Sequence, residues 1–258
     1  MISVSEIKFI KSLEIKKYRI DNQLFVVEGE KLVLELLDSN YIIKDLFATD
    51  GFSHKTKVPI RPISEKELHR ISFLKTPNKI LAVVEMPSFD ACDSIFLDSK
   101  IGLTIGLDGV RDPGNMGTIL RIANWYGIRF VFCSADCVDC YSPKVVQSSM
   151  GALFRTQVIY GDLPDFITKM KRGNGSAIFT TELGGTSIYD QEIASNSMLI
   201  FGSESHGVRP EISILSDQRL LIPSFPPNGR DMESLNVGVA VGITCAEFRR
   251  REIISGYL

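Results

Sequence analysis

Two parts of the chain combine a short apolar run with a polar loop that could do chemistry. Met198–Phe201 leads into Gly202-Ser-Glu-Ser-His-Gly207, and Arg219–Ile222 leads into a proline-rich loop that ends at Ser234-Leu-Asn236. Short apolar runs that stop at such loops are typical of buried strands. In parallel α/β sheets, ligands bind beyond the carboxyl ends of the strands. We therefore expect one pocket to gather the following residues: Gly202, Glu204, Ile222, Ser234 and Asn236.

A third loop with glycines lies earlier, in Leu107-Asp-Gly-Val-Arg-Asp-Pro-Gly-Asn-Met-Gly-Thr-Ile-Leu-Arg121. It connects an apolar run to a helix for which Asn115 is a suitable N-cap and Gly127 a suitable C-terminal residue. It lacks the Lys-Ser/Thr of a phosphate-binding P-loop and the G-x-G-x-x-G of a Rossmann site, so both are disfavoured. Arg121 stands among apolar residues and lies about 600° further round the helix than Asn115, nearer its opposite side.

Charge and composition limit the classes of function. The 258 residues carry a net charge of −2, so no global basic field gathers nucleic acid, which would have to bind local patches. Each such patch is more often simply a solvated face. The candidates are Lys11/Lys16/Lys17/Arg19, Arg111 with Arg129, and Arg249/Arg250/Arg251. No apolar run reaches the length of a membrane span and residues 1–17 lack the apolar core of a signal peptide, so we expect a cytoplasmic protein.

The cysteines allow two interpretations. Five cysteines without a secretory context indicate reduced thiols. Cys133, Cys137 and Cys140 have the spacing seen at the iron–sulfur cluster of radical enzymes. Alternatively, Cys133 ends an apolar strand, where cysteine behaves as a small hydrophobic residue. No repeating strand–helix barrel precedes these cysteines, and we find no His/Cys/Asp metal cluster.

The order of elements predicts an α/β protein preceded by a small α+β unit. In the first unit we expect a helix over 2–20, strands at 25–27, 41–48, 58–62 and 81–85, a helix over 31–38, and a helix that a Ser64–Glu67 capping box opens. The pattern breaks near 90–98, so we divide the chain into 1–95 and 96–258. From residue 101 strands alternate with helices, which implies a mostly parallel sheet flanked by helices. Its expected strands are 101–107, 129–133, 156–160, 177–181, 198–201 and 220–222, and its expected helices are 115–126, 142–150, 163–172, 208–215 and 234–251.

Taken together, the three motifs resemble the SpoU (TrmH) family of RNA 2′-O-ribose methyltransferases. The first family motif matches Asp112-Pro-Gly-Asn115-Met-Gly117 with Arg121, the second matches Gly202-Ser-Glu204, and the third matches Ile222-Pro223 with Ser234-Leu-Asn-Val237. The resemblance covers roughly residues 101–250. Residues 1–90, with Phe25-Val-Val-Glu-Gly-Glu30-Lys31, look like the L30e-type substrate-binding domain that is common in this family.

The resemblance implies a fold, a cofactor and partners. The fold is the SPOUT fold with a C-terminal trefoil knot, the cofactor is S-adenosylmethionine without metal, and the partners are RNA, rRNA rather than tRNA, and a second copy of the chain. Gly238 and Gly242 give the last helix a small-residue face that could pack on a second subunit. The implied catalytic residues are Arg121, Asn115, Glu204, Ser234 and Asn236, and the implied cofactor-binding residues are Thr180, Gly202, Ile222 and Leu235.

Two departures from the family pattern bear on the substrate. The second motif continues with Ser205-His206 where another glycine is usual, and the stretch from Ser224 to Glu233 is long and rich in proline. Two other classes remain open beside a methyltransferase for rRNA or tRNA. One is a non-catalytic RNA-binding relative, and the other is an iron–sulfur radical enzyme.

Overall fold

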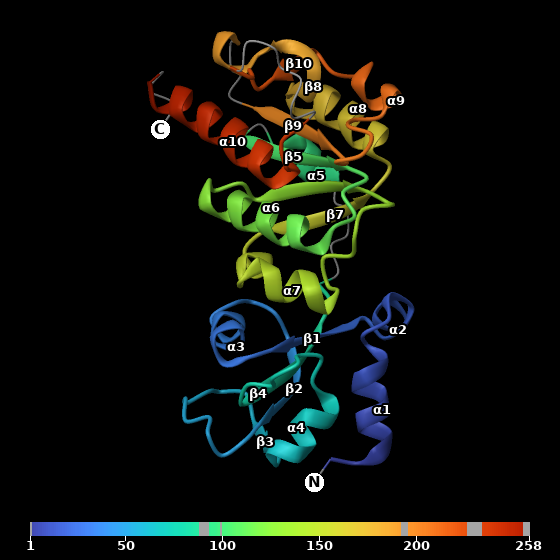
Figure 1. The fold of residues 1–258 in the computed structure, drawn as a ribbon, viewed down its shortest axis with the longest axis vertical. Coiled ribbons are helices and arrows are strands. Elements are labelled where there is room, and N and C mark those ends of the chain that lie inside the picture. The colour runs from blue at the N-terminus through green and yellow to red at the C-terminus, as the bar shows by residue number, and fades with distance from the viewer. Residues whose placement is uncertain (1, 88–92, 99, 192–195, 226–233, 255–258) are drawn as a thin grey trace. The chain divides into compact units, whose positions relative to one another are not determined.

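A computed structural model describes residues 2–87, 93–98, 100–191, 196–225 and 234–254 of the chain (Figure 1). These residues form two compact units. Unit 1 comprises residues 1–88 and 139–155, and unit 2 comprises 89–138 and 156–258. No helix among the described residues is long and apolar enough to cross a membrane.

Unit 1 is built on a mixed four-stranded sheet in the order β1-β4-β2-β3. β4 (Ile80–Glu85) pairs antiparallel with β1 (Leu24–Glu28) and with β2 (Ile43–Ala48), whereas β3 (Ile60–Pro62) runs parallel to β2. β3 lies at the sheet edge, as its prolines predict. The helices of the unit are α1 (Val4–Ser12), α2 (Lys16–Asn22), α3 (Glu30–Leu37) and α4 (Glu65–Ile71).

Two predictions about the helices of unit 1 have opposite outcomes. The capping box at Ser64 is confirmed, because its hydroxyl accepts from the Glu67 N–H and the Glu67 carboxylate accepts from the Ser64 N–H. The single helix expected over 2–20 is wrong, since α1 and α2 are separate. The Arg19 guanidinium, 3 % exposed, donates to the carbonyls of Leu13 and Glu14 at the break. These carbonyls therefore have a partner other than a continuing helix.

Residues 139–155 complete unit 1, although they lie between two strands of unit 2 in the sequence. They contain α7 (Pro143–Ser149) and a short 3₁₀ turn, η1 (Ala152–Phe154). Asp139 forms an ion pair with Arg19 at 2.6 Å, and the Gln147 side chain donates to the Glu28 carbonyl at 2.8 Å. The helix expected over 142–150 thus exists, but it packs with the first unit.

Unit 2 is organised around a six-stranded sheet in the order β10-β8-β9-β5-β6-β7, in which every neighbouring pair is parallel. The predicted parallel sheet is therefore confirmed. The strands are β5 (Leu103–Asp108), β6 (Phe130–Ser134), β7 (Gln157–Gly161), β8 (Ala177–Ser187), β9 (Ser197–Gly202) and β10 (Gln218–Leu221). β8 is longer than expected, and its pairing with β10 shifts register between Arg219 and Leu220.

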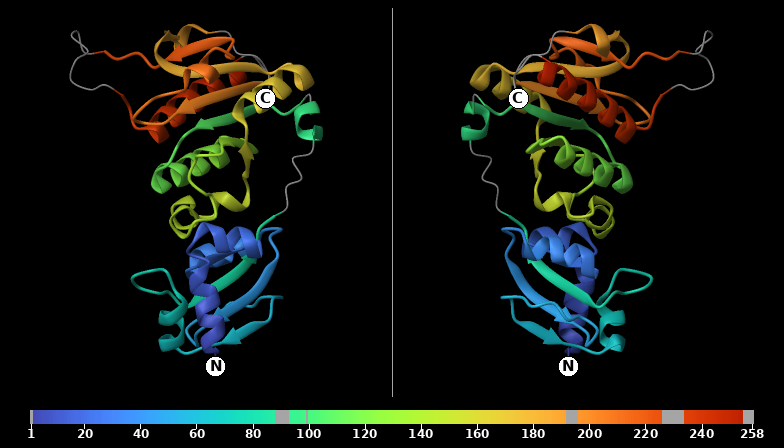
Figure 2. Two further views of the ribbon diagram at one scale, coloured as in Figure 1. Left: turned by 90° about the vertical axis from the view of Figure 1, so that its right-hand side faces the viewer. Right: turned by 90° about the vertical axis from the view of Figure 1, so that its left-hand side faces the viewer.

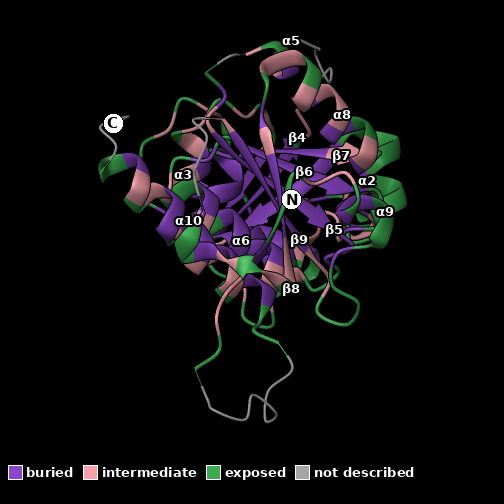
Figure 3. Ribbon diagram, turned by 90° about the horizontal axis from the view of Figure 1, so that it is seen from above, coloured by how far each residue is buried: buried purple, intermediate pink, exposed green. Residues whose placement is uncertain are grey.

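Helices cover both faces of this sheet, which Figure 2 shows from two sides. α8 (Leu163–Asn174) and α9 (Pro210–Ser213) pack on one face, and α5 (Asp93–Leu97) packs against α8. α6 (Pro113–Trp125) and α10 (Val237–Ile254) pack on the other face, where the rings of Phe179 and Phe248 meet at 5.3 Å. The inner strands β5, β6 and β9 are buried between the layers (Figure 3), so their sequences are mostly apolar rather than alternating, whereas the edge strand β10 and the second half of β8 are partly exposed.

Candidate active site

The loop after β9 folds back on itself in a tight turn. Ser203 and Gly207 exchange two backbone hydrogen bonds, at 2.9 and 3.2 Å. A Cβ atom added at Gly202 would lie 1.9 Å from the carbonyl carbon of Gly207. Glycine at 202 is therefore required by the returning chain itself, and no ligand is needed to explain it.

This geometry predicts a large difference between two glycine substitutions in unit 2. Gly202→Ala is expected to lower the free energy of unfolding by at least about 1–3 kcal/mol, because the added methyl group has no space. At Gly184 nothing lies within 4 Å of an added Cβ, so Gly184→Ala should stay within about 0.5 kcal/mol of wild type. Thermal unfolding of the two variants tests this prediction, and equal melting temperatures would contradict it.

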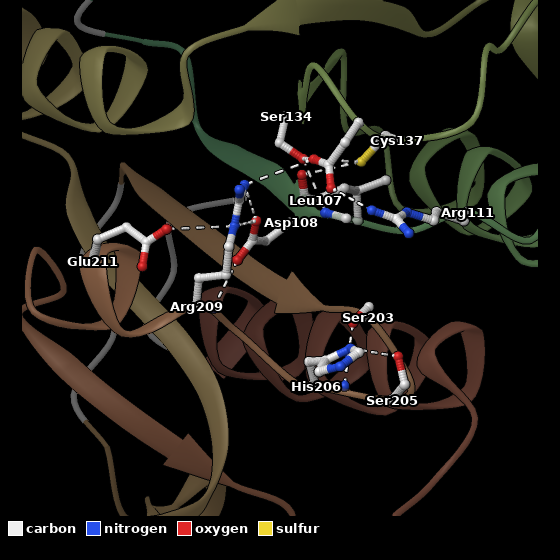
Figure 4. Close-up of polar contacts among 12 residues, drawn as sticks. Leu107, Asp108, Arg111, Ser134, Cys137, Ser203, Ser205, His206, Arg209 and Glu211 are labelled. Carbon is white, nitrogen blue, oxygen red and sulfur yellow. Dashed lines mark hydrogen bonds and ion pairs between the residues drawn. The ribbon is translucent and has the colours of Figure 1, made fainter.

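A buried carboxylate anchors the far end of the same loop (Figure 4). Asp108, at the end of β5, is 2 % exposed and accepts from both the backbone N–H and the guanidinium Nε of Arg209, each at 2.7 Å. The hydrogen bond with Asp108 raises the pKa of the Arg209 guanidinium. The sequence interpretation missed both residues, although Asp108 ends a strand inside the first motif, which is where a functional carboxylate is expected.

A second acidic residue continues this network beyond β6. Asp136 accepts from the Ser134 hydroxyl at 2.7 Å and from the Arg111 guanidinium at 3.2 Å, and these hydrogen bonds lower its pKa. The Ser134 oxygen in turn accepts from the N–H of Gly109, which has a φ of +69°. The ends of β5 and β6 are thus tied together beneath the first motif.

A cavity of about 470 Å³ opens beside the middle of β8 and the ends of β9 and β10. Such a volume lies within the usual range for small-molecule sites. Of the nine sequence-predicted site residues, five line it: Gly202, Glu204, Ile222, Ser234 and Leu235. Other lining residues were not predicted, among them Thr181, Glu182 and His206. The His206 ring nitrogen Nδ1 lies 2.7 Å from the Ser205 hydroxyl, which is drawn in Figure 4.

Glu204 connects this cavity to two amide side chains from distant parts of the sequence. Its Oε1 accepts from Asn115 Nδ2 at 2.6 Å and from Asn236 Nδ2 at 2.9 Å. Asn236 Nδ2 also lies 2.9 Å from Asn115 Oδ1, so the three side chains form a closed cluster. One residue from each of the three motifs therefore meets at one point.

The helix starts on either side of this cluster differ from prediction. The N-cap of α6 is Asp112, whose carboxylate accepts from the Asn115 N–H at 2.8 Å, which leaves the Asn115 amide available for Glu204. At α10, Asn236 Oδ1 accepts from the N–H groups of Gly238 and Val239. Asn236 therefore caps α10, and Ser234 is exposed at the cavity.

Comparison with known proteins agrees with this arrangement. Residues 102–246 match the model of the SpoU rRNA Methylase family, and residues 5–82 match an MRM3-like substrate binding domain. The chain belongs to the SpoU rRNA Methylase family. The resemblance to this family and the mostly parallel α/β fold are thereby confirmed.

Individual relatives extend over nearly the whole chain. The 23S rRNA (guanosine(2553)-2′-O)-methyltransferase RlmP of Bacillus subtilis is 30% identical over 95% of this chain and 96% of its own. A TrmH-family structure from Porphyromonas gingivalis is 38% identical, with a TM-score of 0.86 over 97% of this chain and 99% of that one. An AdoMet-bound rRNA methyltransferase from Sinorhizobium meliloti is 27% identical, with a TM-score of 0.84 over 97% of each chain.

Thr180 and Arg121, both predicted from the family motifs, lie outside the cavity lining. Thr180 is fully buried, and its hydroxyl donates to Glu182 instead. Arg121 is exposed on α6 and forms no hydrogen bond or ion pair with any residue that the structure describes. The structure thus brings Asn115, Glu204 and Asn236 together but leaves Arg121 apart from them.

The small-residue face of α10 is used within this SpoU-family chain. An added Cβ would lie 3.0 Å from the Thr118 side chain at Gly238 and 3.6 Å from Ile122 at Gly242. Both contacts are with α6 of the same chain, so close packing of this face on another helix is confirmed within the chain. Its packing on a second subunit stays a prediction.

Most cations of the basic patches have structural partners. Arg249 donates to the Tyr126 carbonyl at the end of α6, and Arg251 donates to the carbonyls of Ile188 and Tyr189 in a turn after β8. Arg129 and Arg111 pair with Asp98 and Asp136. Lys16 and Lys17 are exposed.

The cysteine motif has the features of a packed interior. Cys133, Cys137 and Cys140 are each at most 3 % exposed. Hydrogen bonds from Cys133 and Ser134 lower the pKa of the Cys137 thiol to about 7. Within the described ranges, no group of three His, Cys, Asp or Glu residues could hold a metal ion. Residues 226–233, in which the unusual proline-rich stretch falls, lie outside those ranges.

Proposed function

We propose that this protein transfers a methyl group from S-adenosylmethionine to a ribose 2′-hydroxyl of rRNA. The observation that carries the proposal is the Asn115–Glu204–Asn236 cluster beside the cavity that β8 and the ends of β9 and β10 line. The relatives named as rRNA methyltransferases favour rRNA over tRNA as the substrate.

The cavity suits the cofactor in size and in composition. Gly202, Ile222 and Leu235 offer backbone groups and an apolar wall, as a nucleoside ligand requires. S-adenosylmethionine supplies an activated methyl group on a sulfonium. The protein has to hold the hydroxyl about 3–3.5 Å from that methyl carbon and to stabilise the oxygen as its proton leaves.

We assign the stabilisation of the oxygen to Arg121. Glu204, Ser234 and Asn236 would orient Arg121 and the ribose. A guanidinium does not readily lose a proton, so we infer that Arg121 binds the RNA phosphate and stabilises the developing alkoxide. Asn115 holds the first motif against Glu204. Because Arg121 is outside the cavity lining of its own chain, we infer that it acts at the cavity of a second copy, in a homodimer.

The remaining assignments concern the whole chain. We propose that residues 1–95 bind the RNA substrate and that residues 96–258 form the methyltransferase domain with a trefoil knot in its C-terminal part. The match of residues 5–82 to a substrate binding domain supports the first assignment. We also propose that the protein acts in the cytoplasm.

Calorimetry and RNA mapping test the proposed function together. We expect the purified protein to bind S-adenosylmethionine and its demethylated product without added metal, and a strain that lacks the protein to lose one 2′-O-methyl group in rRNA. Loss of a 2′-O-methyl group from tRNA instead would identify tRNA as the substrate. Absence of cofactor binding, with and without RNA, would favour a non-catalytic RNA-binding relative.

A further inference from the structure

The cavity contains a second carboxylate that the proposed mechanism does not use. Glu182 lies on β8 and lines the cavity together with Thr181 and Leu183. Its side chain is 23% exposed, so the carboxylate is half-buried. None of the three motifs includes it.

Buried neighbours hold this carboxylate in place. Thr180, two residues earlier on the same face of β8, is fully buried and donates its hydroxyl to Glu182 Oε1 at 2.9 Å. Ser216 Oγ lies 3.2 Å from the same hydroxyl. Arg219 Nε is 3.8 Å from Glu182 Oε2, beyond hydrogen-bonding distance. Oε2 therefore accepts no hydrogen bond from the described residues and keeps its capacity to accept one from a ligand.

The positions of the two acidic residues suggest which part of the cofactor each one faces. Glu204 is on the loop after β9, bound to Asn115 and Asn236, and the reacting methyl group has to lie near that cluster. Glu182 is on the neighbouring strand β8, whose partner is β10. The nucleoside end of the same ligand would extend toward these strands. A carboxylate accepts hydrogen bonds well from the hydroxyls of a ribose.

We propose that Glu182 accepts hydrogen bonds from the ribose hydroxyls of S-adenosylmethionine and that Thr180 positions its carboxylate. This inference rests on the proposed function, because it assumes that the cavity binds this cofactor. It gives the Thr180 side chain an indirect role, beside the cofactor-binding role that the family resemblance implies for this residue.

Calorimetry with S-adenosylhomocysteine and with its 2′-deoxy and 3′-deoxy analogues tests the contact directly. Wild-type protein should bind at least one deoxy analogue about 10-fold more weakly than the parent compound, as the loss of a hydrogen bond to a charged group requires. Glu182→Gln and Glu182→Ala should bind the parent compound about 10-fold more weakly. They should lose little further affinity for that analogue, because the partner of the missing hydroxyl has already gone. If Glu182 had only a structural role, the ratio of the dissociation constants for the deoxy analogue and the parent compound would be the same in the variants as in wild type.

Matched variants separate this role from folding. Glu211→Gln removes a carboxylate that is 61% exposed and outside the cavity lining, and it should bind like wild type. Thr180→Val should weaken binding of the parent compound and reduce the ratio of the dissociation constants for the deoxy analogue and the parent compound. Thr180→Ser should keep both quantities near their wild-type values.

Two results would overturn the inference while the proposed function stands. In one, the Glu182 variants bind the parent compound as tightly as wild type does. In the other, they still discriminate against the deoxy analogues as strongly as wild type does. Failure of the wild-type protein to bind any of the three ligands would instead overturn the proposed function, and the inference with it.

Discussion

Arg121→Ala is expected to lower the single-turnover rate of RNA methylation by about 10²–10³, while cofactor affinity stays nearly unchanged. The rate falls because the developing alkoxide loses a charged donor. The affinity stays because Arg121 is outside the cavity lining of its own chain. Arg121 is exposed and without a partner among the described residues, so its removal should not disturb the fold. Binding, rate and melting temperature are to be measured on the same preparation.

Two further substitutions define the role of this arginine. Arg121→Lys should recover little activity, because a point charge does not reproduce the planar guanidinium. Arg129→Ala removes an exposed arginine of the same unit that pairs with Asp98, and it should keep the wild-type rate. Normal turnover by Arg121→Ala, or a loss of activity that only accompanies melting, would show that Arg121 is a structural residue.

Trp125→Asp is expected to raise the dissociation constant of the proposed homodimer by about 30-fold or more, which corresponds to ~2 kcal/mol. Trp125 is the single tryptophan of the chain and is 82% exposed on α6, one helical turn after Arg121. Tryptophan is enriched among the residues that dominate interface energies. Because Arg121 is proposed to act at the partner's cavity, activity should fall together with dimer formation.

Sedimentation at micromolar concentration measures this effect, and the single tryptophan also reports on assembly by its own fluorescence. Dilution of wild type below its dissociation constant should shift the emission toward that of an exposed indole. Ile214→Asp, at a residue 77% exposed beside α9 on the other face of the sheet, should stay dimeric. A wild-type protein that is monomeric and active would refute both the homodimer and the role of Trp125.

Local sequence patterns were sufficient to predict most helices and strands and to identify the family. The inner strands β5, β6 and β9 of unit 2 are buried, so they appear as mostly apolar runs, and the alternation of strands with helices predicts their parallel pairing. The Ser64 capping box was predictable because its two hydrogen bonds join residues three positions apart. The three motifs identified the family for a similar reason, since residue types in order can be read without coordinates.

Only the tertiary structure decided which partners these residues have. Glycine at 202 is required by the backbone of Gly207, Gly238 packs against Thr118 on another helix, and residues 139–155 belong to unit 1 although strands of unit 2 flank them in the sequence. Spacing in the sequence reveals a requirement for a small residue, but the atom that imposes it can come from anywhere in the chain. The same holds for polar groups. The amide of Asn115 meets a carboxylate 89 positions away, because the ends of β5 and β9 lie side by side in the assembled sheet. The buried hydroxyl of Thr180 donates to Glu182 and does not line the cavity, because buried polar groups need hydrogen-bond partners.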